Sequence, residues 1–208
     1  MNLVGHVHVA LARGAGDPEV WLGAMVPDLA HEAGASVGDL DRWSPAAAEG
    51  VRWHRATDAA FHAAPPFLAG VRRLREDLRA AGLGTGPARA VAHAGWELLL
   101  DGALVGHRPT VDAYLAALDV PAARFGAGLP EGERARWSSA LVRRRAAGPP
   151  VLYADAGRVA ALLQRILARR RALAFAAAEV DGVAAVLASH QPSVEAAAAD
   201  VVTAAGSW

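Results

Sequence analysis

The chain has 208 residues, of which 53% are hydrophobic and 20% charged, and this balance indicates a globular protein with a substantial core. The formal net charge is +0, so no overall basic field favours nucleic acid as a partner. The sequence contains no Cys, which excludes disulfides, thiolate metal ligands and a cysteine nucleophile. Any metal ion must therefore be held by His and carboxylate side chains.

The N-terminal segment MNLVGHVHVALARG contains two His and no basic leader, which is untypical of a secretory signal peptide. No run of about 18 uninterrupted apolar residues predicts a membrane span. We expect a cytoplasmic protein without a membrane partner, and the oligomeric state stays open. We expect one domain over residues 1–208, with a metal-site half over 1–107 and further helices over 108–208.

The predicted elements are nearly all helices. Asp17 and Pro18 mark the start of one helix, which Pro27 is expected to end, and Ser44 is expected to cap another that runs from Pro45 through His62. Val151–Tyr153 is too short to argue a sheet. Further helices are predicted over Val7–Ala12, Phe67–Ala81, Pro87–Val105, Pro109–Leu118, Glu131–Ala146, Asp155–Ala178 and Ser193–Ala204. The sequence therefore predicts an all-α, single-domain helical bundle.

Two series of polar residues stand out in this alanine-rich background, each stepping by four residues. The first is His54, Asp58 and His62, and the second is His93, Glu97 and Asp101. Positions i, i+4 and i+8 share one face of a helix, so each series places three ligand-type side chains on one stripe. Imidazole and carboxylate groups suit a divalent transition metal, and two facing helices would bring them to one site.

Several of these residues have a structural alternative. His54 and Asp58 are metal ligands or else a helix N-cap and a surface carboxylate, and the apolar residues around them favour ligands. Asp28, which follows Pro27, is a ligand or a simple N-cap. Asp101 is the weakest candidate ligand, since it fits a solvated position near a helix end equally well.

The remaining histidines also have alternatives. His6 and His8 are two residues apart and cannot face the same way on a helix, so we assign the metal to His6. His62 is a ligand, an acid–base group, a phosphate contact or a satisfied half-buried side chain. Three further histidines are interpreted as surface residues: His31, His107 and His190.

Four segments together resemble one family. They are MNLVGHVHVALA (Asn-x-x-x-His-x-His), LGAMVPDL (Gly-x-x-x-x-Asp), GVRWHRATDAAFHAAP (Gly-x-x-x-His-Arg-x-x-Asp before a proline) and VAHAGWELLLDGAL (an aromatic–acid pair). In this order they resemble the acyl carrier protein phosphodiesterases, a divergent branch of the HD-domain metal-dependent phosphohydrolases. The chain departs from the family at Phe61-His62, where Thr-Asp is usual, and at Glu97, where Asp is usual.

The resemblance implies an HD-domain-like fold and a metal-dependent phosphoric diester hydrolase that releases 4′-phosphopantetheine from holo acyl carrier protein. The expected cofactor is a divalent Mn, Fe, Mg or Zn ion, and the expected partner is acyl carrier protein. The alternatives are a phosphohydrolase of a small phosphorylated metabolite or nucleotide, and a helical binding protein that has lost catalysis. The metal ligands are expected among His6, Asp28, His54, Asp58, His93 and Glu97, with His62 or His8 protonating the leaving oxygen and Arg55 neutralising the phosphate.

Overall fold

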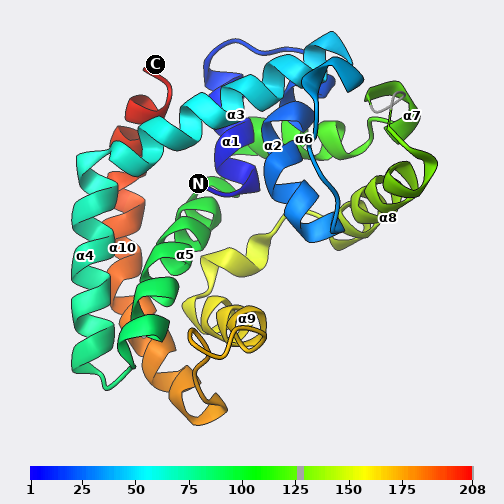
Figure 1. The fold of residues 1–208 in the computed structure, drawn as a ribbon. Coiled ribbons are helices and arrows are strands. Elements are labelled where there is room, and N and C mark those ends of the chain that lie inside the picture. The colour runs from blue at the N-terminus through cyan, green and yellow to red at the C-terminus, as the bar shows by residue number, and fades with distance from the viewer. Residues whose placement is uncertain (126–128, 208) are drawn as a thin grey trace. The chain divides into compact units, whose positions relative to one another are not determined.

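A computed structural model describes residues 1–125 and 129–207, and in these ranges every regular element is helical (Figure 1). The predicted all-α class is therefore confirmed. The α-helices are α1 Leu3–Ala12, α2 Pro18–Ala33, α3 Pro45–Ala63, α4 Pro65–Ala80, α5 Thr85–Leu104, α6 Arg108–Leu118, α7 Ala122–Phe125, α8 Glu131–Ala147, α9 Ala156–Leu167 and α10 Val180–Ala205. Short 3₁₀ helices are η1 Leu40–Arg42, η2 Val151–Ala154 and η3 Ala177–Glu179.

The contacts group the chain into two compact units. Unit 1 comprises Met1, residues 61–104 and residues 150–201, whereas unit 2 comprises residues 2–60, 105–149 and 202–208. Helices α3 and α10 each contribute residues to both units. We describe each unit by itself.

Unit 2 is built around α2, which packs against α1, α6 and α8 (Figure 1). Asp17 caps α2 by accepting a hydrogen bond from the backbone N–H of Glu19, and the Ser44 hydroxyl accepts one from Ala47 N at 3.2 Å at the start of α3. Both predicted caps are therefore confirmed. The core of this unit includes Leu22, Met25, Leu29, Val51, Tyr114 and Trp137, all less than 2% exposed.

Two glycines allow α2 and α3 to approach at backbone distance. A Cβ atom on Gly23 would lie 2.2 Å from the Ala47 carbonyl oxygen, and one on Gly50 would lie 2.2 Å from that of Val20. Because real Cβ atoms do not come this close to backbone atoms, only glycine fits at either position. This contact brings His54, one turn after Gly50, to the carbonyl of Ala24.

Unit 1 is built around α5, which packs against α4, η2 and α9. A Cβ on Gly95 would lie 2.9 Å from Leu187 of α10, so this glycine seats α10 against α5. At the end of α5, a Cβ on Gly102 would lie 2.2 Å from the Tyr153 carbonyl oxygen, so η2 covers this end of the helix. The buried side chains of this unit include Phe61, Leu74, Leu78, Trp96, Leu99, Leu163 and Leu187.

Four predicted helix boundaries are wrong, and the first of them is the start of α1, which lies at Leu3 rather than Val7. Helix α2 does not end at Pro27 but continues to Ala33, because burial of Val26, Leu29 and Ala30 outweighs the one hydrogen bond that proline removes. The helix predicted over Asp155–Ala178 ends at Leu167, where its apolar face ends and three arginines follow. The last helix begins at Val180 rather than Ser193 and passes through Pro192.

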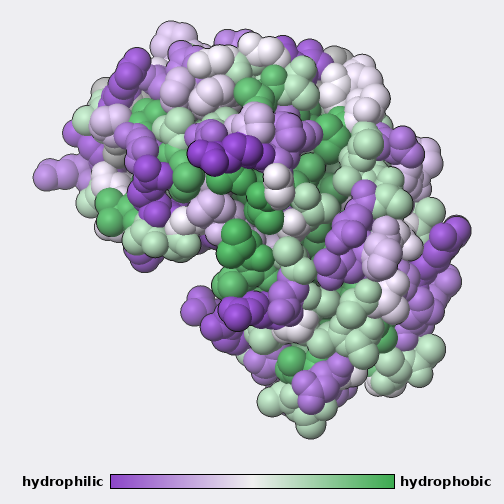
Figure 2. Space-filling model, turned by 180° about the vertical axis from the view of Figure 1, so that it is seen from behind, coloured by the Kyte–Doolittle hydropathy of each residue, from purple (hydrophilic) through white to green (hydrophobic). Residues whose placement is uncertain are grey.

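The surface mixes polar and apolar side chains. Hydrophilic and hydrophobic residues are interspersed over the face that Figure 2 shows. No helix in the described part of the chain has the length and apolar character needed to cross a membrane.

Candidate metal centres

Four of the six predicted metal ligands come together in unit 2, and we call them the first cluster: His6, Asp28, His54 and Asp58. Ligand atoms of His6, His54 and Asp58 all lie within 4.8 Å of one another. Nε2 of His6 lies 4.0 Å from a carboxylate oxygen of Asp28 and 4.0 Å from one of Asp58. Helices α1, α2 and α3 supply these residues, so segments far apart in sequence build the cluster.

The two imidazole rings of the first cluster are buried and stacked. His6 is 2% exposed and His54 is 7% exposed, and their ring centroids lie 3.8 Å apart. The Nδ1–H group of His54 donates to the Ala24 carbonyl at 2.8 Å, which directs Nε2 as the ligand atom. A metal-binding histidine commonly donates its other ring N–H to such an acceptor.

Burial lowers the pKa of His54 below its ordinary value, and the hydrogen bond to Ala24 and the Asp58 carboxylate only partly oppose this effect. The ring is therefore neutral at pH 7, which is the form that binds a metal. Asp28 lies inside α2 and His54 lies inside α3, so neither residue is an N-cap.

The first cluster has the donors and spacing for a divalent ion. Around an octahedral ion with bonds of about 2.1 Å, adjacent ligand atoms lie roughly 3.0 Å apart and opposite ones roughly 4.2 Å apart. The 4.0 Å separations from His6 to the two carboxylates fall between these values. A movement of about 1 Å would bring either of these two separations to that of adjacent ligands.

The other two predicted ligands, His93 and Glu97, come together with His62 in unit 1, and we call these three residues the second cluster. Oε1 of Glu97 lies 3.0 Å from Nε2 of His62 and 3.2 Å from Nε2 of His93. The two Nε2 atoms are 3.3 Å apart, and the two rings are nearly parallel at an interplanar angle of 8°. His62 therefore lies with His93 and Glu97 of α5, although it follows Asp58 by one turn along α3.

Glu97 is held as a carboxylate. Burial alone would raise its pKa, but hydrogen bonds from His62 and His93 and the charge of the Met1 ammonium group outweigh burial and hold the pKa well below the ordinary value. The Met1 nitrogen lies 3.1 Å from Oε1 of Glu97. The second cluster is thus an anionic acceptor surrounded by nitrogen atoms.

Other predicted residues have different surroundings. Nδ1 of His8 lies 2.7 Å from the Thr110 hydroxyl, which also contacts His107, and burial followed by the neighbouring His107 lowers the pKa of His8. Arg55 is exposed beside His54 on α3. Asp101 is fully buried in the last turn of α5, so the alternative of a solvated position is wrong for this residue. Thr110, a buried polar residue that carried no sequence signal, was not anticipated.

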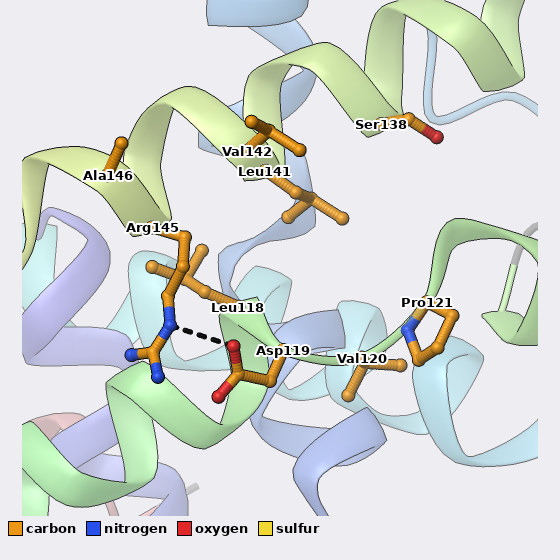
Figure 3. Close-up of a pocket in the computed structure, with 9 residues that line it drawn as sticks. All are labelled: Leu118, Asp119, Val120, Pro121, Ser138, Leu141, Val142, Arg145 and Ala146. Carbon is orange, nitrogen blue, oxygen red and sulfur yellow. Dashed lines mark ion pairs between the residues drawn. The ribbon is translucent and has the colours of Figure 1, made fainter.

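One surface groove among the described residues contains none of the predicted site residues. It has a volume of about 550 Å³ and lies between α8 and the end of α6 (Figure 3). Leu118, Leu141 and Val142 give it an apolar wall, and Arg145 crosses it to pair with Asp119 at 2.7 Å.

Comparisons of the chain with protein-family models, with curated proteins and with solved structures found no match. The candidate centres therefore stand on the residues and their geometry.

Proposed function

We propose that this protein is a metal-dependent phosphodiesterase whose catalytic ion binds to the first cluster. The observation that carries the proposal is the convergence of His6, Asp28, His54 and Asp58 from three helices. A mixed set of two imidazoles and two carboxylates suits manganese, iron or zinc, and magnesium less well, because magnesium prefers oxygen ligands.

The imidazoles and the carboxylates of the first cluster would have different roles. The buried imidazoles supply neutral donors, whereas the Asp28 and Asp58 side chains are 34% and 37% exposed and lie where a substrate has access. Bound there, a divalent cation would polarise a phosphoryl oxygen and make water nucleophilic near neutral pH. Arg55, exposed beside His54, is positioned to neutralise phosphate charge.

Hydrolysis requires water to form a bond to phosphorus while the bond from phosphorus to the leaving oxygen breaks. A proton must then reach that oxygen. His8, which lies in unit 2 with the first cluster and contacts Thr110, is the candidate donor, whereas His62, the other predicted donor, contacts Glu97 in unit 1. Proton donation by either histidine remains a prediction.

For the substrate we propose holo acyl carrier protein, with release of 4′-phosphopantetheine. The support is the resemblance of the uninterrupted Gly50–Pro65 run and the three other segments to the acyl carrier protein phosphodiesterases. A carrier of acidic character would find exposed arginines at Arg169–Arg171, whereas Arg144 and Arg145 are paired with Glu32 and Asp119. Arg169–Arg171 are thus more available to such a carrier than Arg144 and Arg145.

Mass spectrometry of a holo carrier protein, incubated with this protein and Mn²⁺, Fe²⁺, Mg²⁺ or Zn²⁺ in turn, tests the proposal. We expect loss of the prosthetic group with at least one ion and no loss with a chelator. The matched controls are Asp58→Ala, which removes a ligand, and His31→Gln, which changes an exposed histidine outside both clusters.

The other outcomes identify the alternatives. Turnover of a generic phosphodiester, with the carrier protein left intact, would replace the carrier substrate by a small phosphorylated metabolite or nucleotide. No turnover of either compound, in protein that binds no metal, would overturn the enzyme proposal in favour of a binding protein.

A further inference from the structure

The second cluster has the spacing of a tetrahedral metal site. Ligand atoms around a tetrahedral zinc ion lie about 3.3 Å apart when the bonds are about 2.0–2.1 Å long. The three separations among His62 Nε2, His93 Nε2 and Glu97 Oε1 are 3.0, 3.2 and 3.3 Å. These atoms therefore already occupy three corners of such a tetrahedron, without the inward movement that the first cluster needs.

The surrounding aromatic side chains hold the two imidazoles in this arrangement. The Phe67 ring, 2% exposed, meets the ring of His62 edge-on at 5.2 Å and that of His93 at 5.5 Å. Trp96 packs edge-on against Phe67 at 5.2 Å, and Phe61 contacts His62 at 5.1 Å. Packing of this kind restricts rotamers and preorganises ligands.

Solvent reaches the cluster from the histidine side. The side chain of His93 is 48% exposed and that of His62 is 32% exposed, whereas that of Glu97 is 17% exposed. Zinc sites that keep an open coordination position can use two His and one carboxylate as ligands, with a water molecule in the fourth position.

We propose that His62, His93 and Glu97 bind a second divalent ion of the zinc type, with tetrahedral geometry and water as the fourth ligand. The ion replaces the hydrogen bonds that the two imidazoles make to Glu97 and ties the last turn of α3 to α5 within unit 1. This site uses none of the residues of the first cluster, so it stands whether or not the protein is a phosphodiesterase.

Metal binding by untagged, full-length protein tests the proposal, with zinc for stoichiometry and cobalt(II) for geometry. We expect the parent to bind two zinc ions and the Asp58→Ala variant to retain one. With cobalt(II), the retained ion should show the intense visible absorption of a four-coordinate ion rather than the weak bands of a six-coordinate ion.

Variants of the second cluster locate that ion. In the Asp58→Ala background, Glu97→Gln should lower zinc affinity by at least ~10–100-fold, because substitution of residues that only hydrogen-bond to a metal ligand already causes a loss of this size. His190→Gln is the matched control, because His190 also contacts a carboxylate of unit 1, Asp77 at 2.6 Å, but belongs to no group of three candidate ligands in the described part of the chain. We expect that control to retain the ion.

His93→Gln keeps the test decisive if Glu97→Gln does not fold, since His93 is the most exposed ligand. An Asp58→Ala protein that binds no zinc, or one whose zinc affinity is unchanged by both Glu97→Gln and His93→Gln, would overturn the second site. Neither result would affect the assignment of the first cluster, which activity and metal binding of the parent test separately.

Discussion

The two clusters bury opposite chemical groups. In the first, His6 and His54 are buried and the Asp28 and Asp58 side chains are about one-third exposed. In the second, Glu97 is the more buried group, and the His62 and His93 side chains are more exposed. Burying a neutral imidazole costs less free energy than burying a carboxylate. The second cluster therefore needs the nitrogen atoms around Glu97 to stabilise its charge, whether or not a metal is bound.

The clusters also differ in how they are assembled. The first is built by three helices, of which α2 and α3 meet through glycine contacts, and its ligand separations of 4.0 Å leave room for adjustment around an ion and a substrate. The second is held by an aromatic surround, with separations of 3.0–3.3 Å. Adjustable geometry suits changing coordination during a reaction, whereas preset geometry suits tight binding of one ion.

The largest expected effect is loss of hydrolysis when the first cluster loses a carboxylate. Asp58→Ala should lower kcat/KM by at least about 10–100-fold, because losing a metal ligand costs at least as much as losing a residue that only supports a ligand. Steady-state hydrolysis of the holo carrier protein, or of a generic phosphodiester, measures the effect against His31→Gln. Parent-like activity in Asp58→Ala would remove the catalytic role of the first cluster.

The next effect tests the glycine contact behind the first cluster. Gly50→Ala places a Cβ against the Val20 carbonyl and should lower the free energy of unfolding by about 1–3 kcal/mol, as overpacking does. It should also weaken metal binding at the first cluster and leave zinc at the second unchanged. Urea unfolding and metal titration measure both effects.

A matched control for the Gly50 substitution is Gly132→Ala. Gly132 lies in α8, where an added Cβ meets open space. This control should raise stability by up to about 1 kcal/mol, since alanine is the better helix former. Equal destabilisation of both variants would contradict a specific contact at Gly50.

The third effect is on the pH dependence of stability, and it tests the buried carboxylate of the second cluster. The folded-state pKa of Glu97 lies below its ordinary value of 4.5, so the carboxylate stabilises the folded chain above pH 4.5, and this contribution is lost as the pH falls through the lowered value. Glu97→Gln should cost about 1–2 kcal/mol at pH 7 by removing charge-assisted hydrogen bonds. It should also flatten the loss of stability in acid.

Chemical unfolding at several pH values, without metal, measures the Glu97 effect. Glu195→Gln serves as the control because Glu195 is an exposed glutamate of unit 1. An acid profile of Glu97→Gln that matches the parent would show that the carboxylate does not stabilise the fold.

The smallest expected effect is that of His93→Gln in metal-free protein. The His93 side chain is 48% exposed, so losing its contact with Glu97 should change stability by less than about 1 kcal/mol. In the Asp58→Ala background, where the first cluster has lost a ligand, the same substitution should remove the thermal stabilisation that zinc gives. Differential scanning calorimetry with and without zinc separates the change in metal-free stability from the stabilisation by zinc. Retention of the zinc-induced shift would place the ion elsewhere.

Local sequence signals predicted the fold class and most helix starts. Asp17 and Ser44 form the caps that their positions predicted, and four-residue spacing placed His54 with Asp58, and His93 with Glu97, on common faces. Boundaries failed where tertiary burial outweighed a local signal, as at Pro27. The grouping of His62 was left open, although residues eight apart on a helix lie about 12 Å apart along its axis, too far for both ends to reach one ion easily.

The sequence by itself determined the ligand types, their helical spacing, the absence of thiol chemistry and the all-α class, because these follow from composition and local backbone preferences. Only the tertiary structure decided which ligands meet. Helix packing through Gly23 and Gly50 brings His54 to Ala24, and the turn of the chain after Ala63 brings His62 to His93 and Glu97. A helical stripe specifies a face, but the partner of that face depends on contacts between residues distant in sequence.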